Sequence, residues 1–211
     1  MAGRSAGQYS QQCADMKEKI ILIGGGGHCK SCIDVIEREG KYKIAGIVDV
    51  LEKLNENILS YEIIATDNDL QDLAKRYNYF LVALGHIESP DTRIKLFVTL
   101  KDLGAKFPVI ISPIAYVSKH AQVAEGTIVM HHALINAGAR VGRNCIINTK
   151  TLVEHDAVIE DHCHISTGAV VNGGVTIGSG SFFGSGAVAA ENTSIPSKSF
   201  IKANSLIPKK R

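Results

Sequence analysis

The chain has 211 residues, of which 45% are hydrophobic and 21% charged, a composition typical of a folded globular protein of one or two domains. Its formal net charge of +2 gives no electrostatic reason to expect nucleic acid as a partner. No apolar run approaches the roughly 20 residues of a membrane span, and the N-terminus lacks the apolar region of a signal peptide. We therefore expect a cytoplasmic protein that has no membrane partner.

The first segment, residues 1–15, is polar and small and has no periodicity, whereas MKEKIILIGGGGH from Met16 onward is typical of the start of a domain. We interpret residues 1–15 as a tag or a disordered extension.

An α/β pattern begins at Lys19. An apolar run over residues 20–23 precedes a glycine loop, a helix-spaced apolar set follows, and a second apolar run covers residues 44–48. Further segments have the same alternation: strands at 61–65 and 79–84, and helices at 69–77 and 90–103. This pattern predicts a Rossmann-like, doubly wound domain over residues 16–107, which ends near Pro108 and Pro113.

The glycine loop, GGGGHCKS, follows a strand and opens a helix, where backbone N–H groups and the helix dipole favour a phosphate. It fits neither G-x-G-x-x-G, because Cys29 or Lys30 occupies the third glycine position, nor the Walker spacing. Asp49 follows the second strand, about where such folds place an acid near the ribose or base. A turn residue at the end of a strand would look the same.

Cysteine usage argues against a disulfide framework, because the five cysteines are odd in number and scattered. Cys29 and Cys32 form a CxxC, but no second CxxC accompanies it to complete a zinc site. We expect both to be buried thiols.

From Ile111 to Ile207 an apolar residue returns every six positions, and 15 of these 17 positions are Ile or Val. A second column, four places later, is small from Ala115 to Ala169. A period of six fits no helix, so the pattern predicts short parallel strands stacked coil on coil, with a turn in every unit. Glycines at regular places suit turns with unusual backbone angles.

These repeats resemble the hexapeptide-repeat acyltransferases. The resemblance implies that three hexads make one coil of a left-handed parallel β-helix, about five coils in all. A β-solenoid that serves only as a scaffold is the alternative.

The strand, GGGGHCKS loop and helix, followed by this β-helix, resemble the nucleotide-sugar N-acetyltransferases of bacterial glycan biosynthesis. Sialic acid O-acetyltransferases have the same layout, so O-acetylation of sialic acid or a related sugar is one alternative, and a non-catalytic scaffold that binds a sugar nucleotide is a second. The resemblance implies that the chain acetylates the amino group of a UDP-linked deoxy-amino sugar with acetyl-CoA. The substrate residues that it implies are Gly26, Gly27, His28 and Asp49, and in the ALGHIES segment Gly85 and His86. A surface loop is an equal alternative for His86.

His155 lies in the hexad VEHDAVI and is followed at once by Asp156. Acetyl transfer from a thioester needs a base that takes a proton from the attacking amine or hydroxyl, and a neutral imidazole titrates in the right range. A neighbouring carboxylate orients such a base, and Glu154 and Asp156 both qualify by position. The family resemblance favours Asp156. A solvated turn histidine is the plain alternative.

The resemblance further implies that His164 and backbone groups near Gly173 contact acetyl-CoA, and that Asn148 is a polar residue of the active site. An inward asparagine that bonds to turn amides is an equal alternative for Asn148. The γ-class carbonic anhydrases share this β-helix and bind zinc through three histidines, and histidines are frequent in these repeats, so a zinc site is an alternative use of them. The spacing of His131 and His155 disfavours it within one subunit, so we expect no metal. The basic C-terminal residues, Lys209 to Arg211, are interpreted as a solvated tail. The resemblance implies a homotrimer whose subunits share the active sites.

Overall fold

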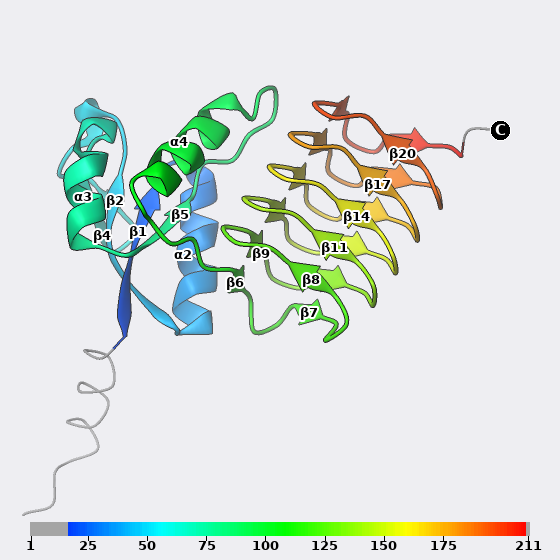
Figure 1. Ribbon diagram of the computed structural model, residues 1–211, viewed down its shortest axis with the longest axis horizontal. Helices are drawn as coiled ribbons and strands as arrows, with labels where there is room; N and C mark the ends of the chain where they lie inside the picture. The colour runs from blue at the N-terminus through cyan, green and yellow to red at the C-terminus, as the bar shows by residue number, and fades with distance from the viewer. Residues whose placement is uncertain (1–16, 210–211) are drawn as a thin grey trace, which may run out of the picture.

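The computed structural model describes residues 17–209, which form an α/β part followed by a long stack of coils (Figure 1). Residues 1–15, interpreted above as an extension, lie outside the described residues, as do Cys13, Lys210 and Arg211. Within residues 17–209, no helix is long and apolar enough to cross a membrane.

The α/β part is built on one sheet with strand order β3-β4-β2-β1-β5, parallel except for β3. Its strands are β1 Glu18–Ile23, β2 Tyr42–Val48, β3 Asn57–Ile58, β4 Tyr61–Ala65 and β5 Tyr79–Val82. The predicted strands are present, although the last ends two residues early. The hairpin strand β3 was not predicted, because two residues carry too little periodicity to be recognised.

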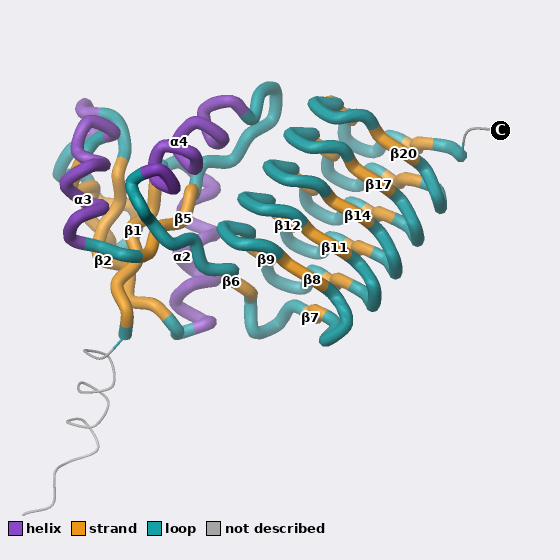
Figure 2. The backbone as a smooth tube through the Cα atoms, viewed as in Figure 1, coloured by secondary structure: helices purple, strands orange, loops and turns teal. Residues whose placement is uncertain are grey.

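Helices cover both faces of this sheet, as predicted for a doubly wound domain. They are α2 Gly27–Glu39, α3 Leu70–Arg76 and α4 Asp91–Asp102, with short 3₁₀ turns η1 Leu51–Lys53 and η2 Asp67–Asp69. Helix α2 packs with Ile20 and Leu22 on one face, and α3 and α4 pack with Ile21 and Ile23 on the other. Helix α2 also contacts β6, the first strand of the coils, so it lies between the two parts of the protein (Figure 2).

The remaining chain is a left-handed parallel β-helix, as predicted, and three of its short strands make one coil. The strands are β6 Ile110–Ile111, β7 Tyr116–Val117, β8 Gln122–Val123, β9 Ile128–Val129, β10 Leu134–Ile135, β11 Arg140–Val141, β12 Ile146–Ile147, β13 Leu152–Val153, β14 Val158–Ile159, β15 His164–Ile165, β16 Val170–Val171, β17 Thr176–Ile177, β18 Phe182–Phe183, β19 Val188–Ala189, β20 Ser194–Ile195, β21 Phe200–Ile201 and β22 Leu206–Ile207. Each strand pairs with the strand 18 residues later, as Leu134 does with Leu152. The three sheets contain six, five and six strands, somewhat more than five coils.

The predicted column of β-branched residues fills the interior of the β-helix, together with the small column that includes Ala133, Cys145 and Cys163. Turns repeat one backbone conformation every six residues, with φ between +52° and +77°. Glycine occupies this position at Gly126, Gly138 and Gly168 as predicted, and Asp156 adopts it at φ +60°. Cys29, Cys32, Cys145 and Cys163 are buried free thiols, which confirms the prediction for the CxxC pair.

The first residue of each two-residue strand points outward, so these residues form the three outer faces of the β-helix. The three faces differ in the kind of residue that they carry. The covered face (β6, β9, β12, β15, β18, β21) packs on α2 through Ile110, Ile128 and Ile146. The polar face (β8, β11, β14, β17, β20) carries polar side chains such as Gln122 and Arg140. The apolar face (β7, β10, β13, β16, β19, β22) presents an unbroken ladder: Tyr116, Leu134, Leu152, Val170, Val188 and Leu206.

Candidate active site

The glycine loop joins β1 to α2 beneath the segment that follows β5. Gly24 adopts φ +99°, and a side chain there would collide with the packed side chain of Leu84. Gly26 is the N-cap of α2 and forms no side-chain cap, and the first turn contains no acidic residue. A Cβ atom at Gly26 or Gly27 would meet nothing within 4 Å, so the backbone at the start of this helix is open to a ligand.

Asp49 lies beside this loop but serves its structure first. Its Oδ2 accepts hydrogen bonds from the Gly25 amide (2.8 Å) and the Lys53 ammonium (3.2 Å), and its Oδ1 accepts one from the Val50 amide (2.8 Å). Burial opposes ionisation, but these hydrogen bonds outweigh it and lower the pKa of Asp49. The carboxylate therefore holds the loop in shape, and its contact with a ribose or base stays a prediction.

A cavity of about 430 Å³ opens where the glycine loop, the segment after β5 and the covered face meet. It brings together most of the predicted substrate residues and one predicted cofactor residue. Its lining consists of Gly26, Gly27, His28, Ala83, Leu84, Gly85, His86, Ile87, Asn148 and His164. Leu84 and Ile87 belong to the ALGHIES segment that the resemblance implied, but only Gly85 and His86 of that segment were predicted to contact the substrate, because an apolar side chain carries no sign of such a role.

Three histidine rings surround this cavity. The ring centroid of His164 lies 5.6 Å from that of His86 and 6.2 Å from that of His28. His164 Nδ1 lies 2.7 Å from the carbonyl oxygen of His86, so Nδ1 carries the proton and Nε2 is left to accept from Asn148 Nδ2 at 3.2 Å. His164 is thus a neutral imidazole of one defined tautomer.

Burial keeps all three rings neutral. It lowers the pKa of His28 to about 3, and the nearby charge of Arg93 adds to the effect. It also lowers the pKa of both His86 and His164 to about 4. His28 Nε2 and both ring nitrogens of His86 are buried and lack a well-formed hydrogen bond with the described residues, although the backbone of Ser181 lies near enough to His86 to favour its protonated form. Unpaired buried nitrogens are costly, so they suit a site where a ligand supplies the partner.

His155 and Asp156 lie at a different corner, in the turn between β13 and β14. His155 Nδ1 is 2.9 Å from Asp156 Oδ2, and both side chains are exposed, at 64% and 73%. The hydrogen bond to Asp156 raises the pKa of His155 above its ordinary value. The imidazole covers Gly173, where a Cβ atom would come within 2.7 Å of Nε2. Gly173 therefore gives room to the His155 ring.

Within a single subunit, the His155–Asp156 pair does not lie at the cavity that contains His164. Asn148, at the cavity, precedes β13, and His155 follows the same strand, so the two residues flank the apolar face in one coil. His155, Asp156 and Gly173 occupy one corner, whereas His164 belongs to the cavity on the covered face.

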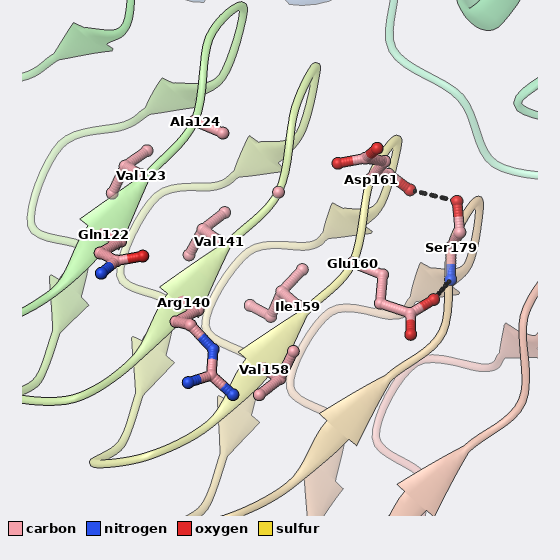
Figure 3. Close-up of a pocket in the computed structure, with 11 residues that line it drawn as sticks. Gln122, Val123, Ala124, Arg140, Val141, Val158, Ile159, Glu160, Asp161 and Ser179 are labelled. Atoms are coloured by element: carbon pink, nitrogen blue, oxygen red, sulfur yellow. Dashed lines mark hydrogen bonds between the residues drawn. The ribbon is translucent and has the colours of Figure 1, made fainter.

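A second hollow, of about 540 Å³, crosses the polar face and includes none of the predicted site residues (Figure 3). At its rim Glu160 accepts a hydrogen bond from the Ser179 amide at 2.9 Å. Among residues 17–209, no group of three or more His, Cys, Asp or Glu side chains has the arrangement needed to hold a metal ion.

Two family models match this chain, one in the α/β part and one in the β-helix. Residues 19–100 match the PglD N-terminal domain, and residues 156–191 match the bacterial transferase hexapeptide repeat. The acetyltransferase domain of PglB from Neisseria gonorrhoeae is 29% identical, with a TM-score of 0.83 over 90% of this chain and 91% of that chain. In both parts the chain is similar to the nucleotide-sugar N-acetyltransferases of the hexapeptide-repeat class, and the matches support an acetyltransferase.

Other solved structures are similar to this chain as well. PerB from Caulobacter crescentus, solved with CoA and GDP-perosamine, is 29% identical, with a TM-score of 0.83 over 91% of both chains. The Neisseria domain has also been solved with acetyl coenzyme A, at a TM-score of 0.81 over 92% of this chain and 94% of that chain. WeeI from Acinetobacter baumannii, at 15% identity and a TM-score of 0.70 over 90% of this chain and 96% of that chain, shows the same fold. A search of curated proteins by sequence finds no match.

Proposed function

We propose that this protein transfers the acetyl group of acetyl-CoA to the amino group of a UDP-linked deoxy-amino sugar. One observation carries the proposal: a cavity with neutral, unpaired histidines opens at the N-terminus of α2, and a histidine–carboxylate pair flanks the apolar face in the same coil. PerB and the PglB domain support the choice of a sugar nucleotide and acetyl-CoA.

The cavity binds the sugar nucleotide in this proposal. The open backbone amides at Gly26 and Gly27 and the dipole of the 13-residue helix α2 suit a diphosphate. The unpaired nitrogens of His28 and His86 bond to sugar or phosphate oxygens. His164 Nε2, already oriented by His86 and Asn148, faces the place where the acetyl donor would approach.

His155 is the general base. Neutral Nε2 takes a proton from the amine as its nitrogen attacks the thioester carbonyl, and the imidazolium then protonates the departing CoA thiolate. Asp156 holds Nδ1 protonated, leaves Nε2 free to accept, and stabilises the imidazolium. Within one subunit, His155 and the cavity lie at different corners of the β-helix. The base that serves a cavity therefore comes from a second subunit.

The apolar face supports this assembly, because a ladder of six exposed or half-exposed apolar side chains is unusual for a face in contact with water. A trimer that turns the three apolar faces toward its axis covers the ladder. It also places the His155 corner of each subunit beside the Asn148 corner of the next at the same height. The polar face stays outside.

Steady-state release of CoA tests the proposal with UDP-linked and GDP-linked 4-amino sugars and free sialic acid as acceptors. We expect turnover with the UDP-linked amino sugar, and its loss by roughly 10²–10⁴-fold in His155→Ala while nucleotide binding persists. Preference for the GDP-linked sugar would favour a PerB-like substrate. Turnover with sialic acid alone would favour O-acetylation and contradict the proposal.

A further inference from the structure

Arg93, on the first turn of α4, is 1% exposed, although no carboxylate of the described residues forms an ion pair with it. Burial lowers the pKa of Arg93 only to about 10, so the guanidinium keeps its charge at neutral pH. The neighbouring Cys32 does not neutralise it, because burial raises the pKa of that thiol. An unpaired buried cation is costly, so its presence calls for an explanation.

The partners of Arg93 are backbone carbonyl oxygens from both parts of the protein. Nη1 donates to the carbonyl oxygens of Val82 and Leu84, where the chain leaves β5, and Nε donates to that of Asn144 in a turn of the β-helix at 3.2 Å. Leu84 in turn packs against Gly24 of the glycine loop. One side chain therefore joins the segment after β5, the β-helix and, through Leu84, the glycine loop.

The segment after β5 forms one wall of the cavity, which residues 83–87 line. The carbonyl oxygen of His86, two residues beyond Leu84, accepts the hydrogen bond from His164 Nδ1 at 2.7 Å, and Asn148 bonds to the other nitrogen of that ring. A displacement of residues 84–86 would thus move His86 and release His164 from its tautomer.

We propose that Arg93 is a positioning residue for the sugar-nucleotide site, where its three hydrogen bonds fix residues 82–86 between the two domains and so place His86 and His164. This inference rests on the proposed function of the cavity. The sequence alone does not distinguish Arg93 from other charged residues, because a charged residue in an amphipathic helix is normally solvated.

The positive charge of Arg93 has a second effect, which a neutral side chain at this position would not have. Arg93 opposes protonation of all three histidines around the cavity and of His162, and so adds to the effect of burial. Asp161 faces His162 and acts in the opposite sense. Arg143 opposes protonation of His162 as well. The charged and titratable groups that act on the cavity histidines are Arg93, His28, His86, His162 and His164.

Arg93→Met and Arg93→Lys separate the two effects, and Lys95→Met is the matched control on the exposed side of the same helix. The measurements are calorimetric affinity for UDP and GDP, KM and kcat, and NMR titration of the histidine ring protons in the free protein. In Arg93→Met we expect affinity for the bound nucleotide to fall about 10-fold, with kcat within about twofold, and the cavity histidines to titrate closer to their ordinary range.

In Arg93→Lys the charge remains but one ammonium cannot reproduce the planar fork, so affinity should fall while the histidines stay neutral. The His86→Ala background gives a further check, because an Arg93 variant that acts through His86 should lose little additional affinity there. Lys95→Met should behave as the wild type does.

Wild-type affinity in folded Arg93→Lys would overturn the proposal, as would wild-type affinity and titration in Arg93→Met. If Arg93→Met fails to fold, Arg93→Lys alone decides. Failure of the wild type to bind either nucleotide would contradict the proposed function instead. The ring titration, which needs no substrate, would then decide whether Arg93 controls the cavity.

Discussion

The imidazole of His155 lies directly over Gly173, where a Cβ atom would come within 2.7 Å of Nε2 and Cε1. The two residues are 18 positions apart, one coil of the β-helix, so they occupy equivalent turns of neighbouring coils. Gly173 has no unusual backbone angle to demand glycine, which leaves the space beneath the imidazole as the reason for it.

Gly173→Ala should therefore displace the proposed base without disturbing the fold. We expect kcat to fall about 10-fold or more, while the affinity for the nucleotide and the melting temperature stay near wild type. Gly168→Ala is a poor control, since Gly168 has φ +66° and would add backbone strain. Ser197→Ala, in an exposed turn at the corner between the polar and covered faces, is the better one. Unchanged kcat in Gly173→Ala would show that the ring position is not critical.

The pH dependence of the reaction should report the His155–Asp156 pair. Since the hydrogen bond to Asp156 raises the pKa of His155, the neutral base is lost as pH falls through that raised value. Asp156→Asn removes the charge that favours the imidazolium, so the acidic limb of the kcat profile should move to lower pH and kcat should fall less than in His155→Ala. An acidic limb at the same pH in Asp156→Asn would contradict this assignment.

The buried histidines should make the protein less stable in mild acid. In the unfolded chain a histidine takes up its proton near pH 6.5, whereas His28, His86 and His164 resist protonation until about pH 3–4 in the folded protein. Between these limits the unfolded state therefore binds more protons than the folded state. The free energy of unfolding decreases as the pH is lowered, by up to about 1.4 kcal/mol per pH unit for each histidine. Urea unfolding at pH 7.5, 6 and 5 measures the slope.

His86→Gln should reduce that slope, because one group that titrates only in the unfolded state is gone. A slope equal to wild type would mean that His86 is not held neutral.

Assembly through the apolar face can be tested with two matched substitutions. Val170 and Val158 are both half-buried valines at the first position of a strand, on the apolar and polar faces respectively. Val170→Glu should dissociate the trimer and abolish turnover, because it places a charge in the covered ladder, whereas Val158→Glu should do neither. Light scattering reads the molar mass. Dissociation by Val158→Glu alone would assign the interface to the polar face.

The six-residue column and the strand–glycine-loop–helix pattern predicted the fold almost completely, because burial of one residue per hexad and a βαβ unit both have a sequence period. Contacts between coils follow once the family resemblance supplies three hexads per coil, since a spacing of 18 then places Gly173 next to His155. The cavity could not be predicted in the same way. The contact of His164 with His86, and the buried position of Arg93, depend on how α2 docks on the covered face and how α4 meets the turns at Asn144 and His162. Backbone carbonyl partners leave no trace in the sequence.

Complementation between two inactive variants tests the central claim, that His155 of one subunit serves the cavity of another. His155→Ala lacks the base. Gly27→Glu blocks the cavity with a side chain that projects into open space, since a Cβ atom there meets nothing within 4 Å, and its charge repels a diphosphate. Each variant alone should be inactive.

In mixed trimers formed by co-expression, a shared site is intact where a subunit with His155 meets a subunit with an open cavity. Random assembly of equal amounts produces such a site in about one quarter of cases. The measurement is CoA release by the purified mixed trimers, with acetyl-CoA and the acceptor sugar that the wild type uses. Recovery toward about one quarter of wild-type turnover is the result predicted by a shared site. No recovery, in trimers proved to contain both variants, would contradict it.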